Sequence, residues 1–273
     1  MLGLGTGLIY PNTIDSVIPY VNAKSVAFDG VDDYGVITSY SALNPPTDSS
    51  GMSWSIWVYT TQASLAATKS DRIFAKSGSG KAEYACTIGG SGKFRFFLYF
   101  NNSTASVDRY RFVPNLVAQL NTWYHLVFVW DSSIATTDAT AMTGYINGTK
   151  YNSTIGNISI NQVPTSSLTV TPSDQVLEVG KQTIGGHRWK GYIDEFSIFN
   201  TALSDADVAE AYNSAAPIDM TTHTASSSLV GYWRMGENDT GTTITNLSST
   251  AGAEDMSLES GAAISSSGYA TGA

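Results

Sequence analysis

The chain has 273 residues, and its 42% of hydrophobic residues are enough to build a sizeable core. Only 14% of the residues are charged, against roughly 25% in a typical soluble domain. Acidic residues outnumber basic ones by 23 to 14, and the resulting net charge of −9 repels phosphate and argues against binding to nucleic acid.

Residues 1–20 are expected to form an N-terminal arm, because glycines separate the leucines in MLGLGTGL. The first basic side chain is Lys24, so the segment lacks the basic start and the continuous apolar block of a signal peptide. No stretch of the sequence approaches 18 consecutive apolar residues, so we expect no insertion into a membrane. The chain therefore combines a weakly charged composition, which is common in extracellular proteins, with an N-terminal segment that does not resemble an export signal.

Residues 25–37, SVAFDGVDDYGVI, predict a strand, a turn and a second strand. Asp29-Gly30 and Asp32-Asp33 supply the residue types that turns favour.

Period-two alternation predicts half-buried strands in the next segments. In residues 52–60, MSWSIWVYT, the aromatic residues Trp57 and Tyr59 share a face with serines. Residues 93–100, KFRFFLYF, alternate in the same way. Residues 123–131, WYHLVFVWD, are apolar on both faces, which suits a central strand.

Two later segments carry turn and cap signals. In residues 144–151, GYINGTKY, the Asn-Gly pair at 147–148 predicts a type I′ hairpin turn, since both positions tolerate positive φ. Ser204 is expected to cap a helix over residues 205–213, with Asp207 completing a weak form of the capping box.

Residues 191–199, GYIDEFSIF, predict a strand with Asp194 and Glu195 on opposite faces, because successive side chains of a strand point in opposite directions. Two carboxylates placed in this way cannot act together on one glycosidic bond, since a retaining hydrolase needs them about 5 Å apart on the same side.

Many short strands separated by turn signals predict an all-β fold: a two-sheet antiparallel jelly-roll sandwich with one short helix and terminal extensions. We expect an arm over residues 1–20, the jelly roll over 21–215, and a C-terminal strand segment with a Ser/Gly-rich tail over 216–273. The last part is too short for a second full domain, so it completes either this sandwich or that of a neighbouring chain.

These segments, in this order, resemble the laminin-G-like, concanavalin-A-like jelly-roll domains. The resemblance rests on the Asp-rich turn of SVAFDGVDDYGVI, on MSWSIWVYT, DRIFAKSG, NTWYHLVFVWD and GYINGTKY, and on WKGYIDEFSIF closed by the helix. It covers roughly residues 21–215 and implies two antiparallel sheets packed face to face, one of them concave. Residues 229–236, LVGYWRMG, resemble the opening of such a domain rather than its end.

Members of this family often hold Ca²⁺, an ion that takes six to eight oxygen ligands from carboxylates and carbonyls. The candidate calcium ligands in this sequence are Asp29, Asp32, Asp33 and Asp194. The alternative is structural: the first three satisfy turn amides, and Asp194 accepts hydrogen bonds from loop N–H groups.

Sugar sites on folds of this kind use exposed aromatic rings that stack on sugar faces. The candidates for a glycan- or partner-binding surface are Trp57, Tyr59, Phe97, Tyr99, Tyr110 and Trp189. The alternative is that these rings pack inside the sandwich or beneath the helix and the C-terminal segment, and an apolar patch here would equally suit a protein interface. The nearby basic residues are expected at exposed positions of alternating strands: Lys93, Arg95, Arg109 and Arg111.

The resemblance to glucanases does not extend to their E-x-D-x-E catalytic strand, because the nearest string here is YIDEF. The sequence also lacks a G-x-S-x-G elbow, a phosphate loop, a dinucleotide fingerprint and a C-x-x-C pair. We therefore expect no enzymatic activity, and a glycoside hydrolase would need carboxylates brought together from distant strands.

Gly- and Ser-rich termini fray when free and become ordered when they dock. With an extracellular type of surface and no export signal, they favour a bacteriophage virion protein: a head-decoration, fibre or tail-associated component that displays an adhesion domain. We expect other virion proteins and further copies of the chain as partners, and host surface glycans as ligands. The alternative is a free extracellular carbohydrate-binding lectin.

Overall fold

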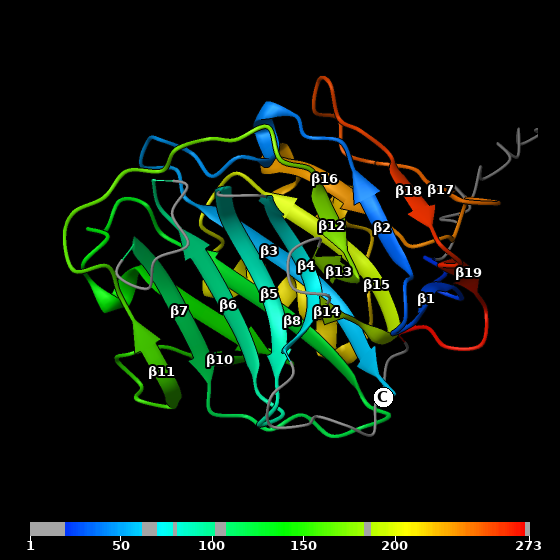
Figure 1. The fold of residues 1–273 in the computed structure, drawn as a ribbon, viewed down its shortest axis with the longest axis horizontal. Helices are drawn as coiled ribbons and strands as arrows, with labels where there is room; N and C mark the ends of the chain where they lie inside the picture. The colour runs from blue at the N-terminus through cyan, green and yellow to red at the C-terminus, as the bar shows by residue number, and fades with distance from the viewer. Residues whose placement is uncertain (1–19, 62–69, 79–80, 102–107, 183–186, 271–273) are drawn as a thin grey trace, which may run out of the picture.

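The structure is a computed structural model, and it describes residues 20–61, 70–78, 81–101, 108–182 and 187–270. Two large antiparallel sheets pack face to face (Figure 1), so the predicted all-β sandwich with one short α-helix is confirmed. The N-terminal arm expected over residues 1–20 lies outside the described residues apart from Tyr20, as do residues 271–273 of the tail.

Sheet A has eight strands in the described part of the chain. They are β1 Ser25–Asp29, β3 Met52–Thr60, β8 Trp123–Trp130, β9 Met142–Ile146, β10 Thr149–Tyr151, β15 Lys190–Phe199, β16 Leu229–Trp233 and β19 Ala263–Ser265. The order across the sheet is β10-β9-β8-β3-β15-β1-β19, and β16 pairs with the other end of β15.

Sheet B has nine strands within the described ranges. They are β2 Tyr34–Ile37, β4 Ser70–Gly78, β5 Lys81–Gly89, β6 Phe94–Tyr99, β7 Arg109–Pro114, β11 Ile158–Gln162, β12 Leu177–Val179, β17 Thr243–Ile244 and β18 Met256–Glu259. Their order is β11-β7-β6-β5-β4-β12-β2-β18-β17, and a separate two-stranded ribbon joins β13 Lys181–Gln182 to β14 His187–Arg188.

The main core lies between the two sheets and follows the alternation of the sequence. Trp54, Ile56 and Val58 of β3 face Phe96 and its neighbours on sheet B, and all of them are fully buried. The rings of Trp54 and Phe96 lie 4.7 Å apart, centroid to centroid. Burial of large aromatic side chains of this kind dominates the stability of a sandwich core.

A second apolar layer covers the outer side of sheet A. Helix α1, Asp205–Tyr212, begins with the predicted capping box, in which Asp207 N–H donates to Ser204 Oγ at 3.2 Å and Ser204 N–H donates to Asp207 Oδ2 at 2.8 Å. Its buried residues, Val208 and Ala211, pack with Tyr232 of β16. Short 3₁₀ helices accompany these elements: η1 Ser41–Leu43, η3 Ala139–Ala141, η4 Asn213–Ala215, η5 Met220–Thr222 and η6 Ser226–Ser228.

The C-terminal segment contributes strands to both sheets of this chain. β16 pairs with β15 and β19 with β1 in sheet A, whereas β18 pairs with β2 in sheet B (Figure 1). Segments far apart in sequence are therefore neighbours, and the C-terminal strands close the sandwich around the first two strands.

The β9–β10 hairpin turns at Asn147 and Gly148, whose φ values are 49° and 72°. Positive φ at both positions is the signature of the predicted type I′ turn. Asn147 Oδ1 also accepts a hydrogen bond from the His125 N–H at 2.8 Å, which ties the turn to the neighbouring strand β8.

Across the described residues, none of the helices has both the length and the apolar character that a membrane crossing requires.

Candidate functional site

The acidic pair of β15 does not follow the alternation that the sequence predicts. Asp194 lies opposite Trp57 of β3 and Ser197 lies opposite Ser55, so three steps along β15 match two steps along β3. This is a β-bulge, and Glu195 adopts a φ of 46° within it. The expectation that Asp194 and Glu195 face opposite ways was wrong, because the extra residue turns both carboxylates toward the outer side of sheet A.

Both carboxylates are fully buried there. Asp194 Oδ2 accepts hydrogen bonds from Asn22 Nδ2 at 2.9 Å and from the Ala270 N–H at 3.0 Å. Burial raises the pKa of Asp194 well above its usual value, and the neighbouring Glu195 charge raises it further. Asp194 therefore holds both ends of the described chain against the sheet, and it does not join the other calcium candidates.

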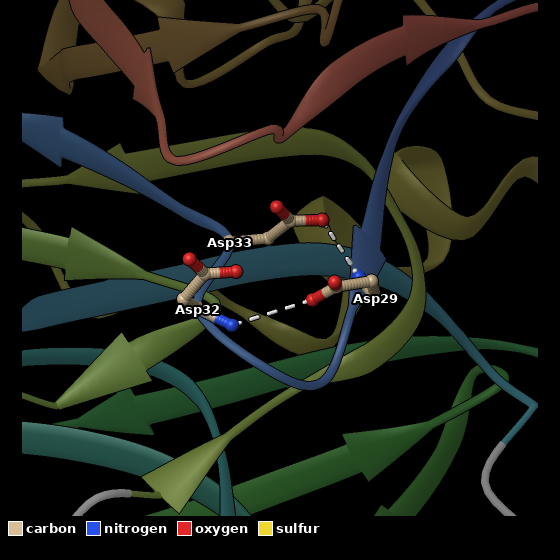
Figure 2. A group of neighbouring side chains, drawn as sticks. All are labelled: Asp29, Asp32 and Asp33. Atoms are coloured by element: carbon tan, nitrogen blue, oxygen red, sulfur yellow. Dashed lines mark hydrogen bonds between the residues drawn. The ribbon is translucent and has the colours of Figure 1, made fainter.

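Those other candidates, Asp29, Asp32 and Asp33, come together in the turn between β1 and β2 (Figure 2). Ligand oxygens of the three lie within 4.8 Å of one another. Asp29 Oδ1 accepts from the Val31 N–H at 2.7 Å, and Asp33 Oδ2 accepts from the Asp29 N–H at 2.8 Å. The turn amides lower the pKa of Asp29, whereas burial raises the pKa of Asp33, with the charges of Asp29 and Asp32 adding to the rise.

The chemistry of this acidic turn fits a hard cation. Within the described ranges no ion pair joins Asp29, Asp32 or Asp33 to a basic side chain, so their charges repel one another. Ca²⁺ prefers such carboxylate oxygens and would take its remaining ligands from carbonyls and water. The same carboxylates also satisfy turn amides, so the structure brings together three of the four predicted ligands while supporting a turn-stabilising role for two of them.

A row of partly exposed aromatic rings crosses one end of sheet A. Trp123 of β8, Tyr59 of β3 and Tyr192 of β15 are direct cross-strand neighbours. The ring centroids of Tyr59 and Trp123 lie 5.5 Å apart, and those of Tyr59 and Tyr192 lie 5.7 Å apart. They open onto a surface pocket whose lining residues are Tyr59, Thr61, Trp123, Tyr192, Ser267, Gly268 and Tyr269.

The next row of side chains along the same strands is covered by helix α1. Trp57 stacks on His125 at 4.8 Å and on Tyr212 of α1 at 6.0 Å, and only 2% of Trp57 is exposed. Helix α1 therefore covers Trp57 and leaves Tyr59 accessible. Of the six predicted surface aromatics, Tyr59 alone is partly exposed.

The remaining aromatic candidates lie on the outer face of sheet B or in the main core. Phe97 and Tyr99 are on its outer face but are each only 8% exposed. Tyr110 and Trp189 are fully buried in the main core, so their expected place on a binding surface was wrong. Tyr110 points inward because its neighbours in sequence, Arg109 and Arg111, occupy the outward positions of β7.

Sequence reasoning missed Trp123 and Tyr192, although both lie in predicted strands. Their place beside Tyr59 depends on the register of β8, β3 and β15, which the sequence does not state. The available signal was weaker: each is an aromatic residue near the start of a strand, where the helix cannot cover it.

Comparisons with known proteins agree with this architecture. A candidate carbohydrate binding protein from Bacteroides ovatus has a TM-score of 0.59 at 13% identity, covering 90% of this chain and 60% of that chain. The heptameric SAP-like pentraxin from Limulus polyphemus has a TM-score of 0.50 at 13% identity, covering 87% of this chain and 94% of its own. The present chain thus spans 60% of the length of the Bacteroides protein.

No curated protein sequence matches the chain. The sequence model of a laminin-G-like family, described as the concanavalin A-like lectin/glucanases superfamily, matches residues 29–209, which is more than half of the chain. This match, together with the two packed antiparallel sheets, means that the chain belongs to the concanavalin A-like lectin/glucanase superfamily.

Proposed function

We propose that this chain is a non-enzymatic adhesion domain that binds carbohydrate through the aromatic row Trp123–Tyr59–Tyr192. The observation that carries the proposal is the partial exposure of three neighbouring rings on three adjacent strands, beside a row that helix α1 covers at Trp57. The name of the Bacteroides structure, a candidate carbohydrate binding protein, supports the same class of ligand.

The pocket offers both kinds of contact that a sugar requires. Aromatic faces pack against the apolar C–H face of a pyranose ring, while hydroxyl and backbone groups bond its hydroxyls. Thr61, Ser267 and Tyr269 supply hydroxyls around the row. Because the lining contains no charged side chain, we propose neutral glycans of a host surface as its ligands.

The positions of the acidic residues support the proposal that the domain is non-enzymatic. The adjacent carboxylates of Asp194 and Glu195 are fully buried and bonded to protein groups, so they have no access to a glycosidic bond. The acidic turn brings three carboxyl groups together, and carboxylate oxygens are the ligands that Ca²⁺ prefers. We accordingly propose Ca²⁺ at Asp29, Asp32 and Asp33.

We further propose that the domain is displayed on a virus particle, among other virion proteins and as a homo-oligomer. The weakly charged, Ser/Thr-rich composition and the Gly- and Ser-rich terminal segments support this placement. Mass spectrometry of purified virus particles should detect the chain. Its absence from these particles would contradict the proposal and favour a free extracellular lectin instead.

Glycan binding is tested with an array of neutral oligosaccharides and the purified chain. Trp123→Ala and Tyr192→Ala should each weaken binding about tenfold or more, because the loss of a buried stacking contact is worth about 1.4 kcal/mol or more. Tyr34→Ala is the matched control, since Tyr34 is a partly exposed tyrosine on sheet B. An array without any neutral ligand, or equal losses in the control, would contradict the proposal.

A further inference from the structure

The outer face of sheet B gathers arginine side chains from adjacent strands. Arg95 lies on β6, and Arg109 and Arg111 lie on β7, directly opposite Tyr99 and Phe97. Strands β6 and β7 contain no acidic residue, although the whole chain carries a net charge of −9. Figure 1 views sheet B from this side, where β5, β6 and β7 lie side by side.

The arginines are held in place by aromatic rings. The Arg109 guanidinium lies 5.3 Å from the centroid of the Phe97 ring and 5.8 Å from that of Tyr99, and Arg111 lies 6.0 Å from Phe97. Cation–π contacts of this kind keep planar guanidinium groups flat against the sheet. Phe97 and Tyr99 are therefore a support for the arginines rather than a stacking surface, which explains their low exposure.

Arg95 has a different support, because its guanidinium lies across Gly89 of β5. A Cβ atom at Gly89 would come within 1.9 Å of Arg95 Cζ, so the glycine leaves room for the guanidinium in this position. On β4, Arg72 lies opposite Thr87, which in turn lies opposite Arg95. Its Nε donates to Gln182 of the small ribbon, so this arginine too is fixed by a partner.

The arginine charges act on one another across the face. Burial lowers the pKa of Arg72, and the charges of Arg95 and Arg109 lower it further. Burial likewise lowers the pKa of Arg95, with the charge of Arg111 adding to the effect. Like charges held this close make the face locally positive and stabilise any anion that binds there.

We propose that this arginine face, Arg72, Arg95, Arg109 and Arg111, binds a carboxylate-bearing polysaccharide such as a polyuronate. Guanidinium groups recognise carboxylates through paired, charge-assisted hydrogen bonds, and arginines spread over β4, β6 and β7 suit a polymer with an acid on successive sugars. The site is separate from the uncharged aromatic row on sheet A, and it adds a class of ligand that the row does not select.

Nucleic acid fits the same face less well. A long polyphosphate is repelled by the net charge of the chain, and its bases would need open rings for stacking. Phe97 and Tyr99 are each 8% exposed beneath the arginines, so they do not offer such rings. A carboxylate polymer needs the guanidinium edges alone.

The test is binding of the full chain to immobilised polygalacturonate, with dextran, dextran sulfate and oligo(dT) as comparisons. We expect binding to polygalacturonate, none to dextran, and weakening as salt is raised. Arg95→Gln and Arg111→Gln should each reduce affinity about tenfold, the loss expected for a hydrogen bond to a charged group. Lys150→Gln, a matched loss of charge on sheet A, should leave binding unchanged, and circular dichroism confirms that each variant is folded.

Each contrary result is decisive. Failure to bind polygalacturonate, equal losses in Lys150→Gln, or stronger binding to dextran sulfate or oligo(dT) than to polygalacturonate would overturn the proposal. Trp123→Ala should keep polygalacturonate binding, so failure of the neutral-glycan site and failure of the arginine face are distinguished by the same set of proteins.

Discussion

Arg234 and Glu195 link the C-terminal segment to the bulge of β15: Arg234 Nε donates to Glu195 Oε1 at 3.4 Å, and only 11% of the arginine side chain is exposed. The Tyr232 hydroxyl donates to the second oxygen of the same carboxylate. Arg234 Cζ also lies 4.3 Å from the ring centroid of Tyr20. One buried acid thus connects β15, the strand β16 and the start of the described chain.

This acid should make stability depend on pH. Burial raises the pKa of Glu195 from 4.5 to about 7, despite the lowering effect of its hydrogen bonds and of Arg234. Between these two values the folded chain keeps a proton that the unfolded chain releases, so the contribution of Glu195 is full below about pH 4.5 and is lost as pH rises through about 7. The Tm of the wild type relative to Glu195→Gln should therefore fall over this window. The corresponding loss in the free energy of unfolding is on the order of 3 kcal/mol.

The comparison with the variant separates Glu195 from groups that act in the opposite sense. Burial lowers the pKa of His125 to about 3. The folded chain therefore loses stability at this group as the pH falls below 6.5, the ordinary pKa of histidine. His125 is present in both proteins, and its effect cancels in the difference. Parallel Tm profiles for the two proteins between pH 4.5 and 7 would show that Glu195 does not hold this proton.

The sequence predicts which side chains of a strand face the core far better than it predicts which strands lie next to one another. The alternation in residues 52–60 places Trp54 inside and Tyr59 outside, and Ser204 marks the start of the helix. The same rule applied to RYRF would have placed Tyr110 inside, because arginines flank it. In β7, alternation and not the aromatic residue type therefore decides which way Tyr110 faces.

The features that the sequence did not predict depend on pairing between distant segments. The bulge at Asp194 becomes visible only when residues of β15 are counted against those of β3. The row of Trp123, Tyr59 and Tyr192 depends on the register of three strands from separate parts of the chain. Alternation within one strand carries no information about either relationship.

Calcium should stabilise the chain through the acidic turn. A ligand that binds only the folded state at 100 times its Kd adds about 2.7 kcal/mol, so Ca²⁺ should raise the Tm and EDTA should reverse the rise. Asp32→Asn and Asp33→Asn should abolish this increment, whereas Asp48→Asn should keep it, since Asp48 accepts hydrogen bonds from Ser50 in an unrelated exposed turn. An equal response in all four proteins would exclude a site at the acidic turn.

The buried pair Lys76–Glu83 should show strong coupling. Its Nζ–Oε1 distance is 2.9 Å, both side chains are at most 1% exposed, and Lys76 Nζ also donates to the Ser173 carbonyl at 2.9 Å. Removing one partner leaves a buried charge, so Lys76→Met and Glu83→Gln should each cost about 3 kcal/mol or more. The double variant should cost less than the sum in urea unfolding, and strict additivity would show that the two charges do not interact.

Gly148→Ala should destabilise the β9–β10 hairpin through two separable effects. Its φ of +72° strains any L-residue, and an added Cβ would lie 2.7 Å from Tyr212 Cδ1 of helix α1. Gly156 has a φ of +74° with no atom within 4 Å of an added Cβ, so Gly156→Ala measures the strain alone, about 1 kcal/mol. Thermal unfolding should show a larger loss for Gly148→Ala. Tyr212 stacks on His125 and Trp57, so its ring cannot move away without exposing them. Equal losses in the two variants would mean that helix α1 does not hold Tyr212 against the turn.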